Sequence, residues 1–183
     1  MAWEVRYCTS CAQALQSVVA EEDGGPKARL RCPACGWTHW NNPTPVLAAL
    51  IELPAHEGRL LLARNAAWPA GMFGLITGFM EAGESPEAGI RREVAEETSL
   101  DVDGLDLIGV YGFERMNQLI VAYHAVAHGE VRLSPELAEY RLVAPEKMRC
   151  WRAGTGYAVA DWLAARGIAP QWIDRPPLSP ASS

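Results

Sequence analysis

Three glutamates lie close together in the sequence and could hold a metal ion. Glu96 and Glu97 lie three and four positions after Glu93, so on a helix their carboxylates would gather at one edge. Like charges placed in this way repel one another, and no lysine lies between them. A divalent cation would relieve the repulsion, and hard carboxylate oxygens suit Mg²⁺ or Mn²⁺. The spacing therefore predicts a metal site, with a solvated acidic helix face as the structural alternative.

The residues just before these glutamates could orient them. Arg92 could pair with Glu96 one helical turn later or reach back to Glu84 in the preceding loop. Gly78 and Gly83 would let that loop fold tightly and bring its backbone close to a metal-bound phosphate. We therefore expect Arg92 and Glu84 to serve the active site by orientation rather than by proton transfer.

A second group of residues with metal-ligand spacing lies near the N-terminus. Cys8 and Cys11 form one CxxC pair, Cys32 and Cys35 form another, and twenty residues separate the two pairs. Two tight pairs of thiolates suit a tetrahedral Zn²⁺ ion, whereas a redox CxxC would not normally occur twice. Four cysteines leave no open ligand position, so the pattern predicts a structural zinc site.

The elements that must position these groups follow from hydrophobic periodicity and turn residues. Strands are expected at 45–53, 59–64, 73–77, 105–113, 117–129 and 140–143. A helix is expected over 86–98, with Ser85 as N-cap and Pro86 at its first position. An amphipathic helix over 154–167 should close the domain. Residues 41–45 are rich in Asn and Pro and indicate a boundary.

Length and composition limit the possible architecture. The chain has 183 residues, which suits one enzyme domain with a small appendage. We divide it into a zinc ribbon (1–44), a catalytic domain (45–169) and a Pro/Ser-rich tail (170–183) that we expect to be frayed.

Charge and hydropathy exclude two classes of partner. The net charge is −6 with only two lysines, so the basic surface of a nucleic-acid-binding protein is not expected. No apolar run approaches the ~20 residues of a membrane-spanning helix, and the first residues do not resemble a signal peptide. We expect a cytoplasmic protein with no membrane partner.

The acidic segment resembles the Nudix box, which is a Gly, Glu and Arg-Glu pattern of fixed spacing. Eight positions match: Gly78, Glu84, Arg92, Glu93, Val94, Glu96, Glu97 and Leu100. Ser99 stands where the box usually has its last glycine, and a positive φ there would cost about 1 kcal/mol. The resemblance implies an α+β fold, namely an α/β/α sandwich around a mixed sheet.

The resemblance also implies an activity, which is hydrolysis of a nucleoside diphosphate linked to another group. Glu93, Glu97 and Glu96 would hold Mg²⁺ together with the backbone carbonyl near Thr77. The metal would activate a water molecule, and Glu96 or Glu97 would accept its proton. Glu136 or Glu139 would be a further metal ligand or base.

A zinc ribbon ahead of the box resembles the NADH pyrophosphatase branch of the family, and this resemblance leaves room for a homodimer. Segment 110–118 lacks the prolines and the tryptophan of that branch's nicotinamide-reading signature. The substrate therefore stays open among NAD(H), ADP-ribose, FAD and similar dinucleotides, with Trp40, Phe113 and Gln118 expected to contact it. The alternatives are a nucleotide-sensing binding protein and a nucleoside triphosphate pyrophosphohydrolase.

Overall fold

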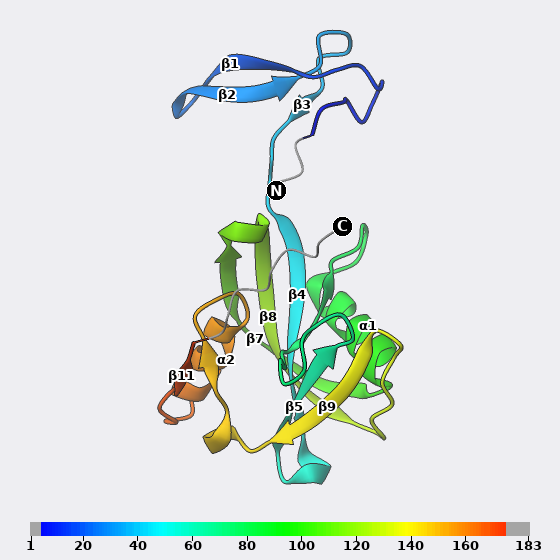
Figure 1. The fold of residues 1–183 in the computed structure, drawn as a ribbon, viewed down its shortest axis with the longest axis vertical. Helices are drawn as coiled ribbons and strands as arrows, with labels where there is room; N and C mark the ends of the chain where they lie inside the picture. Colours follow the sequence, from blue (N-terminus) through cyan, green and yellow to red (C-terminus); the bar gives the residue numbers. More distant parts are fainter. Residues whose placement is uncertain (1–4, 175–183) are drawn as a thin grey trace. The chain divides into compact units, whose positions relative to one another are not determined.

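A computed structural model describes residues 5–174 (Figure 1). The chain divides into two compact units, Met1–Asn42 and Pro43–Ser183. Each unit has its own sheet or sheets. No helix within the described range is long and apolar enough to cross a membrane.

The N-terminal unit is a small antiparallel sheet without a hydrophobic core. Its strands are β1 (Gln16–Glu22), β2 (Gly25–Arg31) and β3 (Thr38–His39), in the order β1-β2-β3. Among residues 5–42, only Cys8 and Cys32 are buried. Because so little apolar surface is buried, this unit needs another source of stability.

The larger unit is built on a six-stranded sheet with the strand order β7-β8-β4-β5-β9 and with β6 paired to β4. The strands are β4 (Thr44–Leu53), β5 (Arg59–Asn65), β6 (Ile76–Phe79), β7 (Asp101–Phe113), β8 (Gln118–His128) and β9 (Leu137–Val143). The helices are α1 (Pro86–Thr98) and α2 (Gly156–Ala164), with short 3₁₀ turns η1 (Pro54–His56), η2 (Glu114–Met116) and η3 (Pro145–Lys147). Strands β4 and β8 run parallel and the other pairs are antiparallel, so the sheet is mixed, as predicted.

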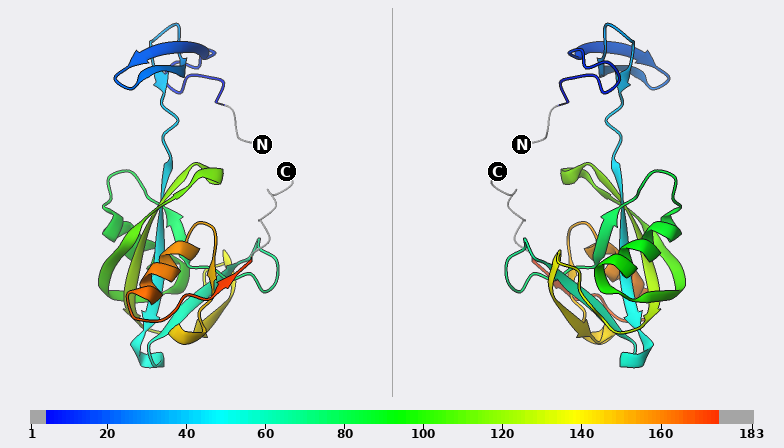
Figure 2. Two further views of the ribbon diagram at one scale, coloured as in Figure 1. Left: turned by 90° about the vertical axis from the view of Figure 1, so that its left-hand side faces the viewer. Right: turned by 90° about the vertical axis from the view of Figure 1, so that its right-hand side faces the viewer.

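The central strand β4 is buried on both faces, and its alternate side chains separate two cores. Ala48 and Leu50 pack in one cluster with Val159 of α2, while Leu47 packs in the other with Ile90 of α1. Figure 2 shows the two helices on opposite faces of the sheet. This arrangement is the α/β/α sandwich that the resemblance implied.

Helix α1 begins and ends as its sequence predicts. The Ser85 hydroxyl accepts a hydrogen bond from the Ala88 N–H at 3.2 Å, which satisfies one of the free donors of the first turn. A Cβ at Gly89 would overlap the Leu47 side chain, so this mid-helix glycine allows α1 to lie against β4. Ser99 ends the helix with φ 58°, in the left-handed region where the family has glycine.

The conformation of Ser99 leads to a stability prediction. Replacing Ser99 with Gly removes the strain of a positive φ, so we expect the free energy of unfolding to rise by about 0.5–1 kcal/mol. Urea unfolding of the two proteins would measure the change, and catalytic turnover should stay the same. The Ser99 hydroxyl donates a hydrogen bond to the Arg132 carbonyl oxygen at 3.3 Å. If Ser99→Gly lowers the free energy of unfolding, this hydrogen bond stabilises the fold by more than the positive φ destabilises it.

Two segments differ from the sequence prediction. The apolar run at 73–77 begins as a buried loop, in which Gly74 bridges to Ala63, and becomes a strand only at Ile76. Residues 172–173, which we expected to lie in a frayed tail, form β11 (Trp172–Ile173), which runs parallel to β10 (Cys150–Trp151). The rest of the predicted tail, 175–183, lies outside the described residues.

Candidate functional site

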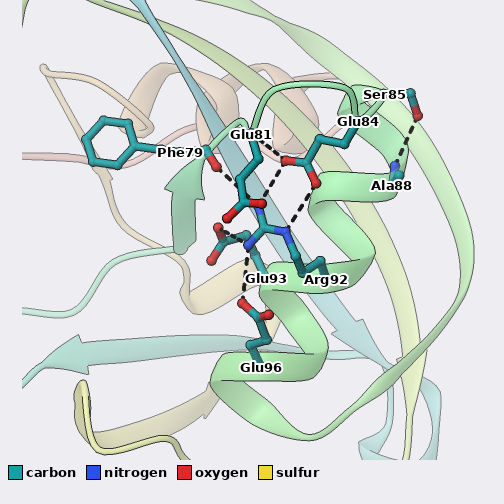
Figure 3. A network of polar contacts seen from close by, with 8 residues as sticks. All are labelled: Phe79, Glu81, Glu84, Ser85, Ala88, Arg92, Glu93 and Glu96. Atoms are coloured by element: carbon teal, nitrogen blue, oxygen red, sulfur yellow. Dashed lines mark hydrogen bonds and ion pairs between the residues drawn. The ribbon is translucent and has the colours of Figure 1, made fainter.

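Arg92 joins the acidic groups of the loop and of helix α1 (Figure 3). Its Nε and Nη2 atoms donate to the two Glu84 carboxylate oxygens at 3.1 and 2.9 Å. Its Nη1 atom donates to Glu93 at 2.8 Å and to Glu96 at 3.2 Å. Both predicted partners, Glu84 and Glu96, are therefore engaged at once. The forked hydrogen bond from Arg92 holds the pKa of Glu84 below its usual value.

Glu93 lies directly against the backbone of β6. A Cβ atom added at Gly78 would overlap the Glu93 carboxyl group, so only glycine permits this contact. Residue 78 pairs with Leu47, whose side chain faces the α1 side of the sheet. The first glycine of the box therefore makes room for a catalytic-site carboxylate as well as starting the loop.

Glu97 and Glu136 come together because the segment after β8 caps helix α1. The N–H groups of Arg132 and Ser134 donate to the carbonyl oxygens of Thr98 and Glu97, at 2.9 and 3.0 Å. Burial and the charges of Glu93, Glu136 and Glu96 raise the pKa of Glu97 from its usual 4.5 to about 7. Arg92 pairs with Glu93 and Glu96 but not with Glu97, and a bound cation would relieve the repulsion that Glu97 experiences.

The raised pKa of Glu97 has a consequence for stability in the absence of Mg²⁺. The unfolded chain ionises Glu97 near pH 4.5 and the folded chain near pH 7, so this group weakens the fold as pH rises through that range. We expect Glu97→Gln to be more stable than wild type, and the gain should grow by about 1–3 kcal/mol between pH 5 and pH 8. Urea unfolding at both pH values, with zinc present and Mg²⁺ absent, measures it. Glu130→Gln is the control, and a gain that does not change with pH would contradict the prediction.

The predicted acidic residues divide into two groups by their surroundings. The charges of Glu93 and Glu136 raise the pKa of the partly buried Glu97, and these three carboxylates are suited to a shared cation. The Glu96 side chain is 62% exposed and turned toward Arg92. Glu139, the alternative to Glu136, is bound by Arg64 at 2.7 Å. The geometry therefore favours Glu136 over Glu139 as a further ligand.

A cavity of about 650 Å³ lies beside β6 on the α2 side of the sheet. Three predicted residues line it, namely Thr77, Phe113 and Gln118. Thr77 precedes Gly78, so the cavity adjoins the backbone against which Glu93 lies. A volume of this size suits a small-molecule ligand.

The cavity also has lining residues that the sequence analysis did not identify. They include Trp68, Met72, Trp151, Tyr157, Arg115 and Arg152. The two arginines face a single acidic lining residue, Glu114, so the lining carries an excess of positive charge. These residues come from loops, η2, β10 and the start of α2, and no motif marked them.

The four cysteines of the N-terminal unit gather as predicted. Their sulfur atoms all lie within 4.8 Å of one another, and neighbouring sulfurs are 3.4–3.6 Å apart. Each pair is followed by a residue with positive φ, Ala12 at 59° and Gly36 at 78°, so both turns have the same shape. The backbone N–H of Cys35 helps lower the pKa of Cys32 to about 6, which favours a thiolate. The cluster suits a tetrahedral zinc ion.

Trp40 belongs to the N-terminal unit. Its ring is 56% exposed, and the Arg29 guanidinium lies over it at 5.4 Å. The expectation that Trp40 contacts substrate stays a prediction.

Comparison with known proteins identifies the family of the larger unit. The model of the NUDIX domain matches residues 44–163. The NAD-capped RNA hydrolase NudC of Stutzerimonas stutzeri is 32% identical over 135 residues, which are 73% of this chain and 46% of that protein. NudC of Mycobacterium tuberculosis is 33% identical over 153 residues, 78% of this chain and 46% of that protein. The chain thus spans about half the length of these relatives, which confirm the resemblance to the NADH pyrophosphatase branch.

Solved structures confirm the fold. A NUDIX hydrolase from Nitrosomonas europaea superposes with a TM-score of 0.73 at 23% identity, covering 93% of this chain and all of that one. An ADP-ribose pyrophosphatase from Streptococcus suis gives a TM-score of 0.56 at 19% identity, covering 73% of this chain and 98% of that one. Together with the match over residues 44–163, they show that this chain belongs to the NUDIX domain family.

Proposed function

We propose that this chain is a Mg²⁺- or Mn²⁺-dependent pyrophosphohydrolase that cleaves the diphosphate bond of a dinucleotide-type substrate. The observation that carries the proposal is the junction at β6. Thr77 lines the cavity, and the next residue, Gly78, lies against Glu93 of the acidic cluster. The cavity and Glu93 lie on opposite faces of β6, so a nucleotide bound in the cavity would extend its diphosphate past the edge of that strand to reach the carboxylates.

The acidic cluster fits a divalent cation. Glu93, Glu97 and Glu136 would hold it, together with the Thr77 backbone carbonyl, because the charges of the other two carboxylates disfavour ionisation of Glu97 when no cation is present. When bound, such an ion polarises the diphosphate and lowers the pKa of a coordinated water.

The protein's own residues would then orient the reactants and move one proton. Arg92 fixes the carboxylates of Glu93 and Glu96 through its hydrogen bonds. Glu97, which lies beside the other carboxylates of the cluster, would take a proton from the attacking water, whose oxygen forms the new bond to phosphorus. The bond between that phosphorus and the bridging oxygen breaks, and two phosphomonoesters leave.

The cavity favours a substrate with an aromatic ring and negative charge. Phe113 offers a ring, over which the Arg115 guanidinium lies at 5.8 Å, and Gln118 offers an amide for a nucleobase. NAD(H), ADP-ribose and FAD all match this chemistry. The relatives are named for NAD-capped RNA, so an RNA with that end is a further possible substrate despite the acidic net charge of this chain.

We propose three further features. The four cysteines would hold a structural zinc ion, and the protein would act in the cytoplasm. A homodimer is the proposed assembly, which gel filtration with light scattering would test.

A substrate panel and two cavity variants test the proposal. The zinc-loaded protein would be incubated with Mg²⁺ and NADH, NAD⁺, ADP-ribose, FAD, NAD-capped RNA or nucleoside triphosphates, and products would be identified by mass. We expect AMP and a second mononucleotide or capped-end product from at least one dinucleotide. Phe113→Ala and Gln118→Ala should each raise KM about tenfold or more, since each removes a substrate contact. Cleavage of triphosphates alone would favour the triphosphate hydrolase, and binding without cleavage would favour a nucleotide sensor.

A further inference from the structure

A second cavity, of about 450 Å³, adjoins the first one. Met72 and Trp151 line both cavities, so these two side chains form a shared wall. The second cavity is built from the loop after β5, the strand β9 and the segment from η3 to β10. None of the acidic residues of the NUDIX box lines it.

Three cations line this second cavity in a protein that is acidic overall. They are Arg141, Lys147 and Arg149, and among residues 5–174 the acidic lining residue is Asp174. None of the three cations takes part in an ion pair within residues 5–174. Arginines elsewhere in the larger unit, such as Arg59, Arg64 and Arg132, do have carboxylate partners. Three cations without an ion pair among the described residues therefore meet at this cavity, and Arg115 and Arg152, also without one, line the adjoining cavity.

Arg141 is held in place before any ligand arrives. Its guanidinium lies 4.1 Å from the centre of the Phe73 ring, which is itself buried. A guanidinium fixed on an aromatic ring loses little freedom when it binds an anion, and its planar fork matches a phosphate group. The remaining wall is apolar, with Leu62, Val143 and Trp151, which suits the ring of a nucleoside.

We propose that the second cavity binds the phosphate group of a nucleotide at a place separate from the NUDIX carboxylates, with Arg141, Lys147 and Arg149 as its ligands. The adjoining nucleoside contacts the apolar wall near Trp151. Two sources share this chemistry. One is a separate mononucleotide, and the other is an extra phosphate further along a substrate that fills the first cavity.

Binding of AMP in the absence of Mg²⁺ tests the site. Calorimetric titration of the zinc-loaded full chain should show saturable binding, and the double variant Arg141→Gln/Arg149→Gln should weaken it about tenfold or more, because charge-assisted hydrogen bonds are lost. The side chains of these arginines are exposed, so the variant should fold, which circular dichroism would check.

Two matched double variants serve as controls for the loss of charge and for binding in the first cavity. Arg59→Gln/Arg132→Gln removes the same charge elsewhere and should leave AMP binding unchanged. Arg115→Gln/Arg152→Gln changes the first cavity only. The proposal is overturned if AMP does not bind saturably, or if its affinity depends on Arg115 and Arg152 but not on Arg141 and Arg149.

Turnover of NADH and NADPH then distinguishes the two sources, because these substrates differ by one phosphate. A loss of kcat/KM confined to NADPH in the Arg141→Gln/Arg149→Gln protein assigns the site to the substrate. Equal changes of kcat/KM for NADH and NADPH in this variant assign the second cavity to a separate nucleotide. Because AMP binding is measured without turnover, failure to hydrolyse any dinucleotide would refute the proposed activity and leave this inference standing.

Discussion

Replacing Glu97 with Gln is expected to lower kcat by about 10³-fold, which is the largest effect of any single substitution considered for this protein. Glu97 is partly buried and lies close to the charges of Glu93, Glu136 and Glu96, so it shares one site with the carboxylates that would hold the cation. The amide keeps the size of the side chain but neither takes a proton nor carries charge for the cation. Steady-state kinetics with the best dinucleotide of the panel would measure the loss.

The matched control for this substitution is Glu130→Gln. Glu130 is exposed and pairs with Arg132 at 2.7 Å, so it loses the same charge outside the acidic cluster. Its kcat should stay within about twofold of wild type, as surface substitutions usually do little. If Glu97→Gln retains wild-type turnover, the base and metal roles assigned to Glu97 are wrong.

Removal of zinc is expected to unfold the N-terminal unit while the larger unit stays folded. Only Cys8 and Cys32 are buried among residues 5–42, so the metal would replace a hydrophobic core. Structural zinc sites of this kind contribute roughly 10–16 kcal/mol of binding free energy, far more than so small a unit could lose and remain folded. Hydrogen exchange after treatment with a zinc chelator would show the effect.

Particular amides report on each unit in that experiment. The Ala12 and Gly36 N–H groups bond to the carbonyls of Cys8 and Cys32, at 2.9 and 3.0 Å, and should lose protection on chelation. Amides of β4 and β8 should keep theirs. Cys32→Ser should release zinc in the same way, whereas Cys150→Ser, at a buried cysteine of the larger unit, should not. Protected Ala12 and Gly36 amides in the zinc-free protein would contradict the prediction.

Short sequence patterns were enough to predict helix α1, strand β4 and the turn at Ser99. Helix α1 runs over Pro86–Thr98 as expected, because Ser85, Pro86 and the box spacing all favour the same helix. The long apolar run that ends at Leu53 predicted the central strand β4, because a strand buried on both faces does not alternate apolar and polar residues. The turn at Ser99 also has the positive φ that the family glycine implied.

The features that were not predicted depend on contacts between distant segments. The β1–β2 strands of the ribbon alternate weakly and bury almost nothing, so their periodicity carries little signal. Strand β11 exists because Trp172 and Ile173 pair with Cys150 and Trp151, some twenty residues earlier. The preference for Glu136 over Glu139 depends on the Arg64 partner of Glu139, which comes from a different strand.

The arginines of the two cavities were missed for the same reason. Arg115, Arg141 and Arg152 lie on different elements, and only the folded sheet brings them to adjoining cavities. In the sequence each one is an isolated cation in an acidic chain. Charge counts over the whole chain conceal such local excess.

The measurement to make first is hydrolysis of NADH in H₂¹⁸O with Mg²⁺, followed by mass analysis of the products. Two mononucleotides should form, with one ¹⁸O atom in the phosphate of one of them, and their formation should be about 10³-fold slower with Glu97→Gln. This result would establish attack by water on the diphosphate through the carboxylates of the NUDIX box. Release of free nicotinamide, or unlabelled phosphates, would show a different bond being broken and would contradict the proposed reaction.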